Sequence, residues 1–223
     1  MVRVSIVFLS VLLLCVVASA QSLTPDSGGV NNGVYSNTYF GFSYTYPKDW
    51  VVHGDATNQR IFELGKERAK DTKALSEASA DVLFKHVHQL LTVFQYALGT
   101  PGLSYNDSVQ IIAEDVRHAP AITDGRVYLL NMQDLLTRMG CQTVQKEPVE
   151  IIISGRQFFR QDFRTPVRDI YVQQAMIVNV TKGYALAFGF TVGPDQNIED
   201  IVKTMDSLKF DVALPHSPGR KPR

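Results

Sequence analysis

Two histidines separated by a single residue are the first candidates for chemistry in this chain. On an extended strand, His86 and His88 would share a face and could both reach one metal ion, whereas on a helix they would point about 200° apart. A metal site needs a third ligand, and no Asp, Glu or His follows them in a recognisable zinc pattern. We therefore keep His86 and His88 as metal candidates, and expect two partly exposed histidines that bind none.

The cysteine to weigh as a nucleophile is Cys141, because the other one, Cys15, lies in an apolar stretch at the N-terminus. Cys141 directly follows a predicted helix over Thr123 to Gly140. The negative end of the helix dipole disfavours a thiolate at that point. A small, buried thiol is the expected outcome.

Basic residues gather around one predicted hairpin, at Arg156, Arg160, Arg164 and Arg168. Arg160, Asp162 and Arg164 alternate onto one face of a strand, which predicts an ion network on an exposed sheet surface. The functional alternative is a patch for an anion or an acidic partner, with Arg160, Arg164 and Arg168 as its binding residues.

Motifs that carry enzyme chemistry are missing from the sequence. There is no G-x-S-x-G, no G-x-x-x-x-G-K-[ST], no G-x-G-x-x-G and no H-E-x-x-H. The 22 basic and 22 acidic residues balance, which excludes a nucleic-acid binder that depends on phosphate neutralisation. We expect a protein that is not an enzyme and uses no cofactor.

The N-terminus reads as an export signal. Arg3 precedes an apolar run, Val4 to Val17, that is shorter than the about 20 residues needed to span a bilayer. The small residues Ala18-Ser19-Ala20 then predict cleavage between Ala20 and Gln21. Residues 1–20 are thus a predicted signal peptide, the product is periplasmic or extracellular, and the mature chain has no transmembrane segment.

One domain is expected over residues 34–212, between a flexible segment at 21–33 and a disordered basic tail at 213–223. In its first half, Phe42, Tyr44 and Tyr46 alternate on a strand. The composition of Thr57 to Phe84 predicts a helix. Residues 82–98 fit either a helix or a strand, and we favour a strand from His88 onward.

The second half of the domain predicts a helix at Thr123 to Gly140 and then a meander of strands. Its last strand, Tyr184 to Val192, has large residues on one face and small ones on the other. The small face would let a helix approach closely, and a closing helix over Gln196 to Leu208 is a candidate cover.

Two short patterns resemble the PsbP-like family, whose α/β/α sandwich is shared with the nuclear-import factor Mog. Tyr46-Pro47 and Trp50 in YTYPKDW resemble the opening turn of that family. Gly183-Tyr184-Ala185-Leu186 and Asp206-Ser207-Leu208-Lys209-Phe210 resemble its final strand and helix. The resemblance spans about Tyr35 to Phe210 and implies an α+β fold, an antiparallel sheet flanked by helices on both faces. It implies a tendency to bind partners, and no activity.

These observations predict an exported, non-enzymatic binding or assembly-support module. Its partner would be an unidentified protein or small ligand in the cell envelope. One alternative is a small hydrolase with a dispersed site. Another is a small-ligand or lipid carrier that uses a cleft beside the aromatic first strand, where Tyr46 and Trp50 are the candidate binding residues. A deep apolar pocket with converging polar groups would favour the carrier.

Overall fold

The computed structural model describes residues 24–26, 28–73, 76, 81, 84–103 and 105–210. The predicted signal peptide, its cleavage site at Ala20 and Gln21, and the predicted basic tail lie outside the described residues.

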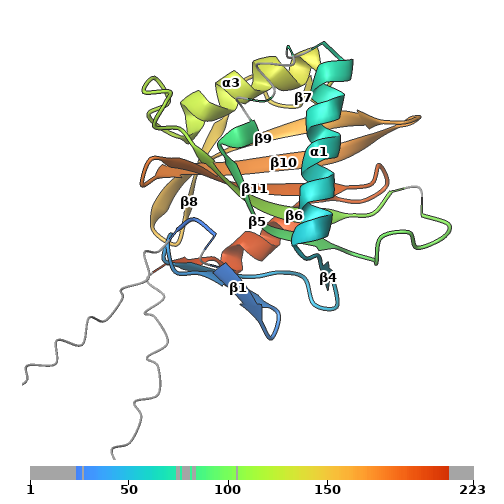
Figure 1. The fold of residues 1–223 in the computed structure, drawn as a ribbon, viewed down its shortest axis with the longest axis horizontal. Coiled ribbons are helices and arrows are strands. Elements are labelled where there is room, and N and C mark those ends of the chain that lie inside the picture. The colour runs from blue at the N-terminus through green and yellow to red at the C-terminus, as the bar shows by residue number, and fades with distance from the viewer. Residues whose placement is uncertain are drawn as a thin grey trace, which may run out of the picture.

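A large antiparallel sheet forms the centre of the molecule (Figure 1). Its strands follow the order β4-β5-β6-β11-β10-β9-β7, and β8 also pairs with β9. Their bounds are β4 Val51–Val52, β5 Val87–Phe94, β6 Ser108–Asp115, β7 Gln142–Thr143, β8 Val149–Ile153, β9 Arg156–Val167, β10 Ile170–Thr181 and β11 Tyr184–Val192. The α+β class predicted from the sequence is confirmed. So is strand rather than helix from His88 onward.

Strand β11 divides the protein interior into two parts. Its large side chains point into an aromatic core, and Ala185 and Ala187 point to the opposite face. The prediction of one large and one small face is therefore confirmed. Both faces are covered, since every residue of β11 except Gly189 is buried.

The large-residue face is covered mainly by a second, smaller sheet (Figure 1). This sheet has the order β1-β2-β3-β12, with β1 at Gly28–Asn31, β2 at Val34–Asn37, β3 at Phe42–Thr45 and β12 at Lys209–Phe210. Residues of the closing helix also cover this side, so the predicted flanking by helices on both faces is confirmed, with a layer of aromatic strand residues added to it. Strand β1 also lies within the segment predicted to be a flexible tether.

The closing helix joins this same side of the large sheet. It consists of α4, Ile198–Val202, and a 3₁₀ turn, Lys203–Ser207. Ile201, Met205 and Leu208 are buried in the aromatic core. The sequence analysis proposed this helix as a cover for the alanine face of β11. The structure shows that it covers the opposite face.

Helix α3, Gly125–Arg138, covers the alanine face instead. Asp124 caps it, since its side chain accepts a hydrogen bond from the Val127 backbone at 2.9 Å. Gly125 lies so close to β10 that a Cβ there would be 2.4 Å from the Val178 carbonyl oxygen. The start of the helix is thus fixed directly against the sheet.

Helix α1, Asp55–Asp71, lies on the same side as α3 (Figure 1). It ends well before Phe84, where the sequence predicted its end. The chain turns at Thr72 and Lys73. Lys73 has a positive φ of 53°, which is incompatible with a right-handed α-helix. Among the described residues beyond this point, Asp81, Phe84 and Lys85 are helical again.

Candidate functional site

A cavity of about 400 Å³ lies between α1, α3 and the alanine-side face of the large sheet. Its lining is mostly apolar. The helices contribute Ile61, Phe62, Ala69, Met132, Leu135 and Leu136, and Met139, the residue that caps the C-terminus of α3, also lines the cavity. The sheet contributes Val87, Ile112, Val167 and Val172, and Phe84 lies on the segment that leads into β5.

Helix α1 presents a narrow apolar stripe to this cavity. Ile61, Phe62, Gly65 and Ala69 lie along one side of the helix, and Ala69 alone among them is fully buried. Gly65 has no side chain to fill the space beside Phe84, whose ring meets Phe62 edge-on at 4.9 Å between centroids. The helix therefore stands over an open space instead of packing tightly on the sheet.

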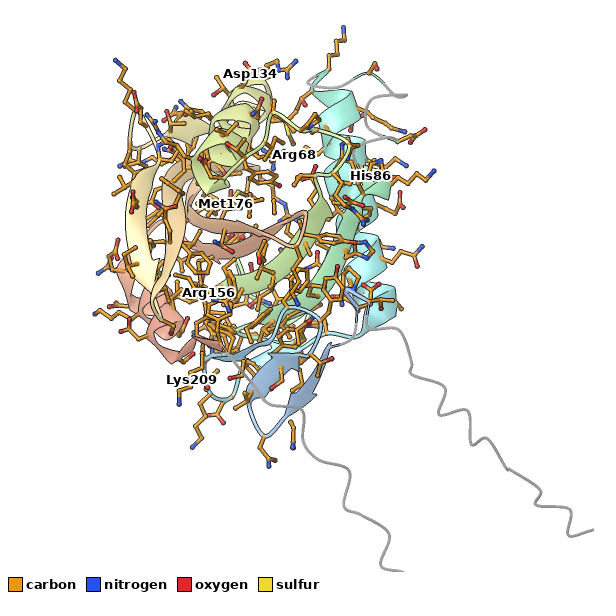
Figure 2. The ribbon with its side chains drawn as sticks, turned by 90° about the vertical axis from the view of Figure 1, so that its left-hand side faces the viewer. Arg68, His86, Asp134, Arg156, Met176 and Lys209 are labelled. Atoms are coloured by element: carbon orange, nitrogen blue, oxygen red, sulfur yellow. The ribbon has the colours of Figure 1, made fainter. Side chains whose placement is uncertain are left out.

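Small residues of β11 line a second, smaller hollow that adjoins the cavity. This hollow of about 70 Å³ lies over Ala187 and Gly189, and shares Gln110, Gln174 and Thr191 with the cavity. A Cβ built on Gly189 would meet its nearest atom, the Gln110 carbonyl oxygen, at 3.8 Å. In Figure 2, Met176, which lines this hollow, and Arg68, which lines the cavity, are labelled on the side of the molecule where α3 lies.

A few polar groups converge on the apolar space. Thr165 donates a hydrogen bond to Oε1 of Gln174 at 3.0 Å, and the Gln89 amide donates to the Leu91 carbonyl oxygen at 3.0 Å. Burial raises the pKa of Tyr105, although its hydrogen bonds to Thr191 and Ser108 act in the opposite direction. These side chains are held by protein partners and give the cavity fixed polar positions.

The most buried charged residue of the cavity wall is Glu114, which is 5% exposed. The Tyr128 hydroxyl donates to its Oε2 atom at 2.7 Å. Burial raises the pKa of the Glu114 carboxyl, against smaller opposite effects from Tyr128 and His118. Burial, and the carboxyl beside it, also raise the pKa of Tyr128 well above its ordinary value.

The aromatic residues proposed as a binding cleft belong to the protein core. Tyr46 is buried, and Trp50 packs against the same core cluster as Phe42 and Phe188. Tyr46 and Trp50 line none of the described cavities. The structure thus gives them a packing role and places the pocket on the other face of the sheet.

The predicted arginine patch is a structural ion network around Arg160. Its guanidinium donates to Asp162 at 2.8 Å and to Glu199 of α4 at 2.6 Å. The network ties α4 to β9. The sequence analysis predicted an exposed network, but the Arg160 side chain is only 15% exposed. Arg164 and Arg168 are exposed and do not join it.

The two histidines contact different partners. The His86 ring stacks on His118 at 4.3 Å between centroids, whereas Nδ1 of His88 lies 3.1 Å from the Asp26 carboxylate. Within the described part of the chain, no three His, Cys, Asp or Glu residues gather where a metal ion could be held. Cys141 is a buried free thiol, as predicted, with the Thr165 hydroxyl 3.5 Å from its sulfur.

The cavity residues themselves were missed by the sequence analysis. Gln110, Ile112 and Glu114 alternate on one face of β6, within a strand whose other face is buried and apolar. An acidic residue in so apolar a strand was the available signal.

No helix in the described residues is long and apolar enough to cross a membrane.

Comparison with known proteins gives similarity in structure only. No family model matches the sequence, and no curated protein does. Among solved structures, the cyanobacterial PsbP of Synechocystis sp. PCC 6803 is 12% identical, with 82% of this chain and 96% of that chain covered and a TM-score of 0.46. One similar structure thus belongs to the family that the sequence resembles.

Two further structures are similar to the chain. A protein from Bacteroides thetaiotaomicron VPI-5482 is 11% identical, over 84% of this chain and 49% of that one, with a TM-score of 0.41. LpqN of Mycobacterium tuberculosis, described as involved in cell envelope biogenesis, is 9% identical. The similarity covers 75% of this chain and 82% of LpqN, with a TM-score of 0.38.

Proposed function

We propose that this protein is a non-enzymatic binding module that holds a small, largely apolar molecule in the cavity between α1, α3 and the sheet. The observation that carries this proposal is the cavity itself. Its volume of about 400 Å³ lies within the usual range of small-molecule sites, roughly 300–1,000 Å³. Its apolar walls with a few fixed polar groups are the combination that distinguishes a carrier from a module with a flat interaction surface.

The chemistry of the lining favours binding over hydrolysis. Among the described residues that line the cavity there is no serine, cysteine or histidine, so a nucleophile with an adjacent imidazole base is not assembled there. Glu114 and Tyr128 are bonded to each other. The lining therefore supports a module that retains its ligand unchanged.

The proposal includes export, which the predicted signal peptide supports. An envelope location would give the module access to the apolar small molecules of membranes. Sequencing the N-terminus of the protein recovered from the envelope or medium should start at Gln21. Recovery of the full-length chain from the cytosol alone would overturn this part of the proposal.

Titration with the neutral fluorescent dye N-phenyl-1-naphthylamine tests the binding function. Wild-type protein should bind one dye per chain in a saturable manner. The variant Gly189→Val should bind it at least tenfold more weakly, because the valine side chain fills the adjoining hollow and extends toward the lining residues that the hollow shares with the cavity. Valine suits a strand, so this variant should remain folded.

The matched control is Gly29→Val, which introduces the same side chain on the exposed strand β1. A Cβ at Gly29 has no neighbour within 4 Å, and it lies far from the cavity lining. The control should bind the dye like the wild type. Absence of saturable binding, or equal binding by a folded Gly189→Val variant, would refute the proposed function.

A further inference from the structure

Glu114 is a buried acid that forms no ion pair with a lysine or arginine among the described residues. It lies on β6, faces the cavity and is 95% shielded from solvent. Among the described residues, no lysine or arginine forms an ion pair with it, and only the Tyr128 hydroxyl donates to its carboxyl group. Its second oxygen, Oε1, receives no hydrogen bond from the described residues.

Burying an ionised carboxylate beside a single hydrogen-bond donor is unfavourable, because the Tyr128 hydroxyl replaces only part of the hydration that the carboxylate loses. Burial accordingly raises the pKa of Glu114, whereas Tyr128 and the nearby His118 oppose the rise. A cation delivered by a ligand would remove this penalty. A positively charged ligand group that reaches this carboxylate would therefore gain binding free energy, whereas a neutral or negatively charged group would not.

The remaining polar groups of the cavity offer no comparable site. Arg68 is the other charged residue in the lining, but it is half-buried and its guanidinium donates to the Pro166 carbonyl oxygen at 2.7 Å. Strand pairing separates the two: Glu114 pairs with Ala185, which is opposite Val180, whereas Pro166 is opposite Tyr171 near the other end of β10. One end of the cavity is thus acidic and deeply buried.

We propose that Glu114 anchors the ligand and that the ligand is a hydrophobic amine, whose ammonium group donates to Oε1 while its apolar body occupies the space between α1 and α3. This inference rests on the proposed function and adds the class of ligand to it. Tyr128 is a positioning residue, because its hydroxyl fixes Oε2 and leaves Oε1 for the ligand.

Displacement of N-phenyl-1-naphthylamine by three ligands of equal chain length tests the inference. Decylamine should displace the dye at least tenfold more effectively than decanol, and decanoate should be the weakest. The variant Glu114→Gln keeps an oxygen that accepts from Tyr128 but has no charge. It should lose at least tenfold in affinity for decylamine and stay within twofold of the wild type for decanol.

The control variant is Glu150→Gln, which makes the same change at an exposed residue of β8. It should leave all three affinities unchanged. If decanol binds but decylamine has no advantage, or if Glu114→Gln weakens all three ligands equally, the inference is wrong and the binding function stands. A preference for decanoate would identify Arg68 as the anchor instead. If neither the dye nor any of the three ligands binds, the proposed function itself fails.

Discussion

The substitution Gly65→Leu distinguishes a helix that forms a ligand cavity from one that merely covers a sheet. Gly65 lies inside α1, where glycine destabilises a helix by about 0.8–1 kcal/mol relative to alanine or leucine. A Cβ there would be 3.8 Å from the Phe84 ring, which is ordinary contact. For a chain of this size we therefore expect the variant to melt roughly 2–3 °C higher than the wild type.

The same leucine should weaken ligand binding, because it extends into the cavity. If it displaces about three methylene groups of an apolar ligand, at about 0.8 kcal/mol each, the loss is about 2.4 kcal/mol, or roughly 50-fold in affinity. Gly65→Ala should gain similar stability and lose only about fourfold in affinity, because it displaces about one methylene group.

Thermal unfolding by circular dichroism and titration with N-phenyl-1-naphthylamine measure the two effects separately. Glu63→Leu, an exposed position on the same helix, is the control and should change affinity by less than twofold. A stabilised Gly65→Leu variant that binds the dye like the wild type would place the ligand elsewhere. A variant that melts below the wild type would show that the space beside Gly65 is needed by the fold.

Three further changes test the structure around the site. Because Glu114 has a raised pKa in the folded state, the folded protein holds a proton that the unfolded chain has released above its ordinary value of 4.5. The stability of the wild type should therefore fall as the pH rises above 4.5. In urea titrations, Glu114→Gln should become more stable relative to the wild type from about pH 5 to 7. Tyr128→Phe should destabilise by about 1–3 kcal/mol in the same assay, because it leaves Glu114 without its donor; an unchanged midpoint would show that the bond contributes nothing. Gly125→Ala should destabilise by about 1–3 kcal/mol, because its Cβ would collide with the Val178 carbonyl oxygen, and a variant as stable as the wild type would contradict the close approach of α3 to β10.

Much of the fold could be predicted because its elements carry local signals. The alternating aromatics of β3, the capped helix α3 and the two-faced strand β11 each follow from residue spacing over a few turns or pleats. The end of α1 could not be predicted, because composition favours helix well past Asp71. The second sheet was also missed. Its strand Gly28–Asn31 forms a local hairpin with Val34–Asn37 inside a segment whose composition favours a loop, and Lys209–Phe210 pairs with Phe42 and Ser43, which are far away in the sequence.

The candidate site was not predictable from motifs, because its residues are dispersed over α1, α3 and the sheet. Cavities arise from how far apart elements pack, and spacing within one segment does not fix this distance. The sequence analysis named Arg160 and Trp50 as binding candidates only in its alternative interpretations, and the fold uses Arg160 to hold α4 and packs Trp50 against the core. For Glu114, the sequence signal was an acidic residue in an apolar strand, and its burial is known only from the structure.

Strand β11 carries its bulky aromatic side chains toward the small sheet and its alanines and Gly189 toward the helices. One face of this strand of nine residues therefore belongs to the aromatic core, and the other face lines the hollow beside the proposed ligand cavity. Under the proposed binding function, substitutions on the helical side would change which ligands fit, while the aromatic side would keep the fold stable.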